Sequence, residues 1–227
     1  MKLENIVFDI LEIKQAAHDD SKIDETWLIH KINNYRALFI QEYYYKRGEI
    51  DQSWIQRYPT FDFEKVNSGD DPSIGFGSIT LGKFRLPKLV PLPMDQGLFQ
   101  VFSSARAKPL SLTDFATMVY RANLNEEIPV GSAFVSKIFQ DIYVYPYLMK
   151  GQAHIIAADP TEVPILESGV IRAFDPELDD YPIDGSIAQA IVLEILTKDL
   201  KILEETIPDI VNDAQSQLKV LKTDGRG

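Results

Sequence analysis

The sequence predicts an α+β protein in which helices from both ends of the chain form a bundle, with a β-rich insert domain projecting from it. At both ends, apolar residues recur at steps of three and four, as on one face of a helix. In the middle, glycine and proline separate short β-prone runs. Because each terminal helix alone leaves an apolar stripe unburied, we expect the two ends to pack on each other. The predicted division is residues 1–58 and 181–227 for the helical bundle and residues 59–180 for the β-rich domain.

The N-terminal part is predicted to form two helices. The first, over residues 2–17, has one apolar stripe: Leu3, Ile6, Val7, Ile10, Ile13 and Ala17. The second is expected to start after Asp24 as N-cap and to end at Gly48. Four of its residues are expected to share one face: Leu28, Ile32, Tyr35 and Phe39. Its last turns are apolar over more than half the circumference, because Tyr43, Tyr44 and Tyr45 follow one another.

The middle segment is predicted to contain several short strands and one helix. The strands are expected within residues 78–86, 97–105, 132–139, 141–148 and 153–158, which alternate or are apolar. A hairpin is expected to turn near Gln140 and Asp141, and the short helix is expected within residues 111–122.

The C-terminal part returns to the helical period. Apolar residues recur at steps of three and four from Ala188 to Leu221. Pro208 lacks an N–H group and is expected to interrupt or restart this helix, with Thr206 as the cap of the new start.

The composition excludes several classes of protein. The chain has 227 residues, no cysteine and a net charge of −11, so disulfides, thiolate metal sites and cysteine nucleophiles are excluded and a reducing cytoplasm is a suitable place of synthesis. A protein that grips nucleic acid needs a basic surface, whereas an acidic one lets DNA pass without sticking. We expect no membrane association and no signal peptide, because no run is long and apolar enough to span a bilayer and the N-terminus lacks a cleavage site.

Charge is unevenly distributed along the chain. Residues 79–110 contain one acid, Asp95, and five bases: Lys83, Arg85, Lys88, Arg106 and Lys108. Residues 159–184 contain one base, Arg172, and eight acids, among them Asp175, Glu177, Asp179 and Asp180. These segments are either two ordinary solvated surfaces or complementary patches that meet between neighbouring copies in a head-to-tail ring.

Residues that could carry chemistry are few. His18, His30 and His154 are far apart in sequence and are interpreted as structural. Three acidic pairs could hold Mg²⁺ or act as acid and base on a sugar, although aspartates in such loops more commonly form turns and caps: Asp19–Asp20, Asp70–Asp71 and Asp179–Asp180. We therefore expect no catalytic residue, no metal site and no cofactor. The alternative function is a hydrolase that depends on acidic residues, either a cell-wall glycosidase or a metal nuclease.

Aromatic residues alternate in the β-prone runs, and two interpretations are open. They either form the two faces of a packed sheet or stack on single-stranded bases. The residues concerned are Phe61, Phe63, Phe99, Phe102, Tyr143, Tyr145 and Tyr147.

Several segments resemble a known family. INNYRALFIQEYY, preceded by DDSKIDETWLI, is similar to the opening of phage head-to-tail connector proteins, which commonly begin with a helix, a polar break and a second helix of the I-N-x-x-R-x-x-x-I type. The resemblance to a structural ring protein of crAss-like podoviruses spans nearly the whole chain. The segments that carry it are VNSGDDPSI, ITLGKFRLPKLVPLP, MDQGLFQV, DIYVYPYL, DPTEV and AQAIVLEILTKDLKILEETIPDIVNDAQSQLKVLK.

The resemblance implies a structural protein of the virion, made in the host cytoplasm and located at the head–tail junction, and not an enzyme. It implies a homo-oligomeric ring, expected to be a dodecamer, that binds the portal protein on one side and the next tail ring protein on the other. DNA would pass through the central channel without specific binding.

The candidate subunit-interface residues are Tyr43, Tyr44 and Tyr45 and the charged residues of the two segments described above. A ring subunit must bury two lateral faces, which would explain a helix that is apolar around most of its circumference. The alternative is that all three tyrosines pack under the β-rich insert of their own subunit. Pro208, Leu218 and Leu221 are the candidates for docking on the portal.

Overall fold

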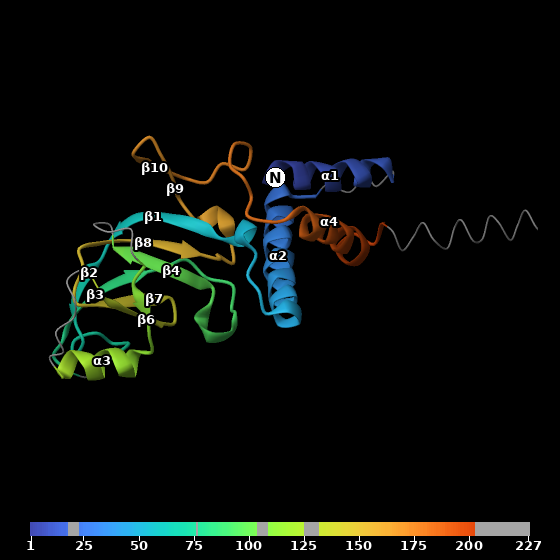
Figure 1. The fold of residues 1–227 in the computed structure, drawn as a ribbon. Coiled ribbons are helices and arrows are strands. Elements are labelled where there is room, and N and C mark those ends of the chain that lie inside the picture. The colour runs from blue at the N-terminus through green and yellow to red at the C-terminus, as the bar shows by residue number, and fades with distance from the viewer. Residues whose placement is uncertain (18–22, 76, 104–108, 125–131, 203–227) are drawn as a thin grey trace, which may run out of the picture.

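The computed structural model describes residues 1–17, 23–75, 77–103, 109–124 and 132–202. The predicted α+β class is confirmed: helices from the two ends of the chain lie together on one side, and the β-sheets lie on the other (Figure 1). Helices α1 (Leu3–Ala16), α2 (Glu25–Arg47) and α4 (Gly185–Glu194) contact one another. A π-helical turn, η4 (Ile195–Asp199), continues α4 and contacts α1.

The predicted ends of α2 are confirmed. The Asp24 carboxylate accepts a hydrogen bond from the Thr26 N–H at 3.2 Å, which satisfies one of the free N–H groups at the start of the helix. At the other end, Gly48 adopts a left-handed conformation with φ 71° and donates its N–H to the Tyr44 carbonyl at 2.7 Å.

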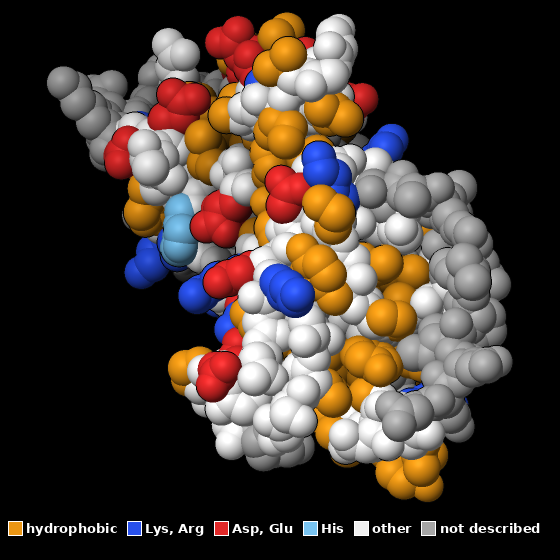
Figure 2. Space-filling model, turned by 90° about the vertical axis from the view of Figure 1, so that its left-hand side faces the viewer, with side chains coloured by type: hydrophobic (Ala, Val, Ile, Leu, Met, Phe, Trp, Pro, Cys, Tyr) orange, Lys and Arg blue, Asp and Glu red, His pale blue; other side chains and the backbone are white. Residues whose placement is uncertain are grey.

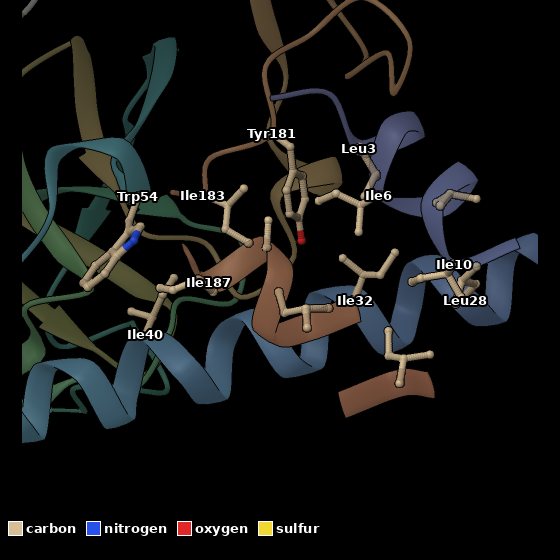
Figure 3. Close-up of a cluster of buried hydrophobic side chains, with 14 of the residues drawn as sticks. Leu3, Ile6, Ile10, Leu28, Ile32, Ile40, Trp54, Tyr181, Ile183 and Ile187 are labelled. Atoms are coloured by element: carbon tan, nitrogen blue, oxygen red, sulfur yellow. The ribbon is translucent and has the colours of Figure 1, made fainter. Parts of the chain in front are cut away.

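The core of the helical part is formed by apolar side chains from all three helices and from the segments that join them to the sheets (Figure 3). The predicted face of α2 is partly wrong, because its buried stripe continues from Leu28 and Ile32 to Arg36 and Ile40. Tyr35 and Phe39 are half-buried beside this stripe. The spacing of apolar residues does not predict this buried stripe, because Arg36 and the neighbouring buried Asn33 are polar.

In the part of the chain that the structure describes, ten strands form three sheets. Their bounds are β1 (Gln56–Asp62), β2 (Glu64–Asn67), β3 (Thr80–Arg85), β4 (Leu98–Ser103), β5 (Ser111–Leu112), β6 (Phe134–Ile138), β7 (Asp141–Tyr145), β8 (Lys150–Ile155), β9 (Ile165–Glu167) and β10 (Val170–Arg172). One sheet has the order β1-β8-β4, the second β2-β3-β7-β6-β5, and the third is the β9–β10 hairpin. All pairings are antiparallel except β5 with β6.

The five predicted strands are confirmed as β3, β4, β6, β7 and β8, and the hairpin between β6 and β7 turns at Phe139 and Gln140 as expected. The predicted short helix is α3 (Phe115–Asn123), which Asp114 caps. Strand β8 begins at Lys150 and ends at Ile155, earlier than predicted. Strand β1 was not predicted, because Pro59 interrupts it and its pairing with β8 shifts register between Tyr58 and Phe61.

The two larger sheets enclose a second apolar core, and the alternating aromatics contribute to it. Phe61 and Phe63 are buried there, and Phe61 stacks on Phe84 with ring centroids 3.9 Å apart. Gly151 of β8 lies against both phenylalanines, and a Cβ atom at this position would come within 2.6 Å of the Phe63 ring. Tyr143 is buried in a smaller cluster that includes Met118 of α3. For Phe61, Phe63 and Tyr143, packing within the sheets is therefore confirmed.

Arg36 connects the helical part to the sheets. Its side chain is fully buried, and its Nε donates to the Pro182 carbonyl at 2.7 Å. Its two other nitrogens donate to the carbonyls of Ala157 at 2.8 Å and Trp54 at 3.3 Å. The guanidinium therefore joins α2 to the start of β1, the end of β8 and the segment before α4. Burial lowers the pKa of Arg36 to about 10, against the opposing influence of Tyr181 and Asp159, so the group stays protonated at neutral pH.

A hydrogen-bond chain next to Arg36 strengthens the same junction. The Tyr181 hydroxyl donates to the Asn33 side-chain oxygen at 2.6 Å, and the Asn33 amide donates to Asp159 at 2.8 Å. The Tyr181 ring itself lies 5.7 Å from the Arg36 guanidinium (centroid to Cζ) and points between the helices (Figure 3). The side chains of Tyr181, Asn33 and Asp159 thus supply hydrogen-bond partners to one another.

Replacement of Arg36 is expected to destabilise the whole chain. Arg36→Lys should lower the free energy of unfolding by about 3 kcal/mol, because one ammonium group cannot reach three carbonyls in different directions and leaves buried acceptors unsatisfied. Urea unfolding followed by circular dichroism measures the change. The matched control is Arg57→Lys, an exposed arginine that donates to Gln152, where a change within about 0.5 kcal/mol is expected. Equal stability of Arg36→Lys and the unmodified chain would contradict the role given to Arg36.

Candidate functional site

The three consecutive tyrosines of α2 have different surroundings. The Tyr43 ring packs edge-on against Trp54 with centroids 5.0 Å apart, and its hydroxyl accepts a hydrogen bond from Arg47 at 2.6 Å. Tyr44 is half-buried against the helical core. Tyr45 is 70% exposed. Tyr43 and Tyr44 therefore contact their own subunit, and Tyr45 presents most of its surface to the outside.

Among the basic candidates, Lys83 is occupied within its own subunit. Its ammonium lies 2.7 Å from an Asp71 oxygen and 3.2 Å from an Asp141 oxygen, and it faces the Tyr143 ring. Burial alone would lower the pKa of Lys83, but hydrogen bonds with Asp71, Tyr143 and Asp141 raise it. Arg85 and Lys88 are exposed, and Arg85 donates to the Gln140 side chain at 3.0 Å. Arg85 and Lys88 are thus better placed than Lys83 to meet another molecule.

The acidic candidates lie in the loop that follows β10. Asp179 is buried and accepts hydrogen bonds from Arg172, one of them 2.8 Å long, and from the Asp175 N–H. Asp175 in turn accepts from the Glu177 N–H. Asp180 lies 3.4 Å from both the N-terminal amine and the Lys2 ammonium. Glu177 is exposed. Much of the acidity of this loop is therefore neutralised within the subunit.

The ion pair with Arg172 lowers the pKa of the Asp179 carboxyl. Burial alone would raise the pKa of Asp179, but hydrogen bonds from Arg172 and from the Asp175 N–H outweigh it and hold the pKa below its ordinary value of 3.8. Arg172 also donates to Glu167 at 2.7 Å, and this contact lowers the pKa of Glu167. Arg172 therefore ties the β9–β10 hairpin to the acidic loop.

Several predicted residues lie outside the described part of the chain. They are the interface candidates Arg106 and Lys108, the portal-docking candidates Pro208, Leu218 and Leu221, and also Thr206, His18, Asp19 and Asp20.

The two described histidines have ordinary structural surroundings. The His30 ring is in hydrogen-bond contact with the Asn34 amide at 3.0 Å, and the His154 ring packs edge-on against Phe102. Burial, with a smaller effect of Arg57, lowers the pKa of His154. Among the described residues, no group of three or more His, Asp or Glu side chains is arranged to hold a metal ion.

The described acidic pairs do not converge on a common site. Asp71 is held by Lys83 and Tyr143 in the loop before β3, whereas Asp179 and Asp180 lie near the N-terminus of the chain. A cavity of about 520 Å³ lies between β1 and β9, and Asp180 is among the residues that line it. Its lining is mainly apolar, and its charged members are Arg57, Asp180 and the terminal residue Met1. This lining does not supply an acid and a base at catalytic separation.

Sequence reasoning missed the most exposed apolar residues. Met94 and Phe139 are each 85% exposed, and Val170 and Leu178 also face outward. Met94 and Phe139 both adopt positive φ angles of 54°, where glycine or asparagine is usual. The sequence feature that could have identified them is a bulky apolar residue at a turn, as in Ile138-Phe139-Gln140 and Pro93-Met94-Asp95. Of the helices that the structure describes, none combines the length and apolarity that a membrane span requires.

Loss of the Asp179 carboxylate is expected to change how stability depends on pH. Because folding lowers the pKa of Asp179, its contribution is fully present above the ordinary pKa of 3.8 and is lost as the pH falls below it. Asp179→Asn should therefore reduce the free energy of unfolding by about 2 kcal/mol at pH 7 and flatten its decline between pH 5 and pH 3.

The measurement is urea unfolding at a series of pH values. Asp180→Asn is the control, because this exposed carboxylate pairs only at the surface and should change stability by less than about 1 kcal/mol. A pH profile of Asp179→Asn parallel to that of the unmodified chain would contradict the assignment.

Comparison with known proteins identifies the family. The family described as phage tail ring protein 2, of the crAss type, matches residues 5–219. No curated protein matches the chain. The family match covers nearly the whole sequence, including the helices and the sheets. The chain therefore belongs to the phage tail ring protein 2 family of crAss-like phages, whose members are structural components of the virion tail and not enzymes.

Proposed function

We propose that this tail ring protein forms the ring at the head–tail junction, where it binds the portal protein on one side and the next tail ring protein on the other. The observation that carries the proposal is the family match over residues 5–219. A ring protein is a homo-oligomer that also contacts other tail proteins. The dodecameric state, the order of the neighbours and the DNA channel through the centre belong to the proposal.

The charge of the chain suits a passage for DNA. The net charge of −11 repels phosphates, so DNA can move past the ring without being held. On the face shown in Figure 2, basic side chains stand between acidic and hydrophobic ones and form no continuous basic surface among the residues coloured there. This distribution also argues against the single-strand-binding alternative, which needs a basic groove lined with aromatic residues.

The lateral contacts are assigned to exposed members of the candidate set. Tyr45, Arg85, Lys88 and Glu177 have outward surface. Lys83, Asp175, Asp179 and Asp180 are engaged within the subunit, so their proposed part is to hold the neighbouring elements in place. Tyr43 and Tyr44 keep the end of α2 in the shape that presents Tyr45.

The remaining assignments concern the bundle and its C-terminal continuation. The division into residues 1–58, 59–180 and 181–227 is proposed as the functional organisation, with the helical parts building the ring. The described chain ends at Ile202, which is buried in the helical core beside α1, α2 and α4. Pro208, Leu218 and Leu221 follow that point in the sequence and are proposed to contact the portal.

The mass of the purified chain tests the function. Sedimentation is measured on the chain alone and after mixing with portal rings of the same phage. We expect the chain to sediment with the portal in a fixed, large multiple, because equivalent docking positions around a closed portal ring take up a defined number of copies. A chain that ignores the portal under all conditions, while binding another tail protein, would contradict the proposed place at the head–tail junction.

Substitution of Tyr45 separates assembly from folding. Tyr45→Ser should leave the melting temperature within about 2 °C of the original and weaken ring assembly, because the exposed ring contributes little to the subunit core. Tyr43→Ser should instead lower the melting temperature by several degrees, because it removes the contact with Trp54. A thermal melt and sedimentation of both variants decide between an interface role and internal packing. Unimpaired assembly of Tyr45→Ser would remove this residue from the interface.

A further inference from the structure

The β9–β10 hairpin projects from the body of the subunit (Figure 1), and several of its apolar side chains have exposed surface. Leu166, Val170 and Ile171 are exposed on it, and Leu178 is exposed on the loop that Arg172 ties to it. Single exposed apolar residues are ordinary, but three on one hairpin with a fourth on the adjoining loop are typical of an interaction surface.

The hairpin is also fixed in position before any partner binds. An isolated two-stranded hairpin is marginally stable. Here the Arg172 guanidinium bridges Glu167 of β9 and Asp179 of the following loop. The apolar side chains are therefore presented by an element whose geometry is already set, which lowers the entropy cost of binding.

A groove of about 240 Å³ lies elsewhere on the subunit, between the segment 87–97 and the turn from β6 to β7. Its lining is mainly apolar and includes Pro87, Leu89, Val90 and Phe139, with Lys88 among them. Small-molecule sites usually measure about 300–1,000 Å³, so this groove suits inserted side chains of a protein better than a cofactor.

Two highly exposed residues with positive φ angles, Phe139 and Met94, lie in or next to this groove. Phe139 lines it, and Met94 precedes Asp95, which also lines it. Both have a φ of 54° and are 85% exposed, so their side chains add little to the core of the folded subunit. The backbone is held there by the ion pair of Lys137 with Asp95 at 2.6 Å and by the hydrogen bond from Arg85 to Gln140. A contact with another molecule would account for these two side chains.

The groove adjoins the other interface candidates. The Gln41 amide of α2 donates to the Pro91 carbonyl at 3.2 Å, so the end of α2 lies beside the segment 87–97. Residues 48–50, which follow α2, form a shallow pocket together with Met94. Tyr45, three residues before Gly48, therefore belongs to the same end of the subunit as the groove.

The hairpin and the groove are complementary in charge and separate in position. Exposed Glu162 and Glu177 lie beside the hairpin, whose Glu167 is paired with Arg172. Exposed Lys88 lines the groove, and exposed Arg85 donates to the lining residue Gln140. In Figure 1 the hairpin is at the top of the subunit and strands β6 and β7 are at the bottom of the sheets. A head-to-tail ring requires two different, complementary surfaces on separate sides of each subunit.

We infer that the β9–β10 hairpin of one subunit docks into the groove formed by residues 87–97 and Phe139 of the next copy of the same chain. This lateral contact rests on the proposed ring and specifies the elements that close it. Val170 on one face of the hairpin and Ile171 on the other supply the apolar part of the contact, and the acids beside the hairpin face Arg85 and Lys88. Repetition of this contact around the axis joins every subunit to two neighbours through different surfaces.

Cross-linking between introduced thiols tests the contact directly. The natural chain has no cysteine, so Val170→Cys and Phe139→Cys place the only thiols in the protein. Rings of the double variant, assembled alone or on portal rings, are treated with a short bismaleimide and run on a denaturing gel. We expect a ladder of linked subunits from the double variant and none from either single variant. The matched control combines Val170→Cys with Tyr120→Cys, a similarly exposed position on α3, and should give no ladder.

The outcomes separate this contact from the ring itself. Rings that form but give no ladder, or give one equally with the Tyr120 control, overturn the contact and leave the ring function intact. Linking of Val170→Cys to the portal or to another tail protein also overturns it, because the hairpin then serves a different partner. If no ring forms under any condition, both the contact and the proposed function fail.

A second variant tests the contact without a cross-linker. Phe139→Gly removes the apolar side chain and suits the positive φ angle, so the melting temperature should stay equal or rise. The concentration needed for ring assembly should increase by at least about tenfold. Tyr120→Ser, which removes a 64% exposed aromatic away from the groove, should leave assembly unchanged. Normal assembly of Phe139→Gly overturns the assignment.

Discussion

The fold depends on one buried cation. Arg36 is fully enclosed, and its hydrogen-bond donors go to carbonyl oxygens from three separate parts of the chain. Removal of a guanidinium from water is costly, and this arrangement offsets the cost by replacing water with three fixed acceptors. The acceptors must stay where they are, so α2, the start of β1, the end of β8 and the segment before α4 have fixed relative positions. The helical part and the sheets are thereby joined through a polar connection as well as through apolar packing.

The acidic side chains of the chain largely serve local structure. Asp24, Asp51, Asp114, Asp159 and Asp184 each accept a hydrogen bond from a backbone N–H at the start of a helix or helical turn. Others neutralise buried or half-buried cations, as Asp71 does for Lys83 and Asp179 for Arg172. An acidic composition therefore does not point to a catalytic carboxylate pair here, because most of the described carboxylates already have partners. What is left for recognition is a smaller set of exposed charges and the exposed apolar residues.

The fold could be predicted where local periodicity decides it, and not where long-range contacts do. Apolar spacing and caps located α1 and α2, and alternation located five strands. Arg36 could not be recognised as a core residue, because a buried arginine has the same local signal as a surface one. Strand β1 contains a proline and a bulge, and β9 and β10 are too short to show alternation. The sequence shows the two charged segments. Only the folded chain shows that Lys83 pairs with Asp71 and that Asp179 pairs with Arg172, both within the subunit.

These pairings also bear on how a ring subunit can be stable alone and still associate. Strong ion pairs confined to one subunit rigidify the surface without being exchanged between copies, whereas exposed apolar side chains on rigid elements lose little entropy when they are covered. Arg172 holds the β9–β10 hairpin, and the pair of Lys137 and Asp95 holds the turn that carries Met94. In both places a charged pair sets the backbone and an apolar side chain next to it stays free. In the proposed ring, internal ion pairs shape the surface and burial of the exposed apolar side chains drives assembly, so the two tasks fall on different residues.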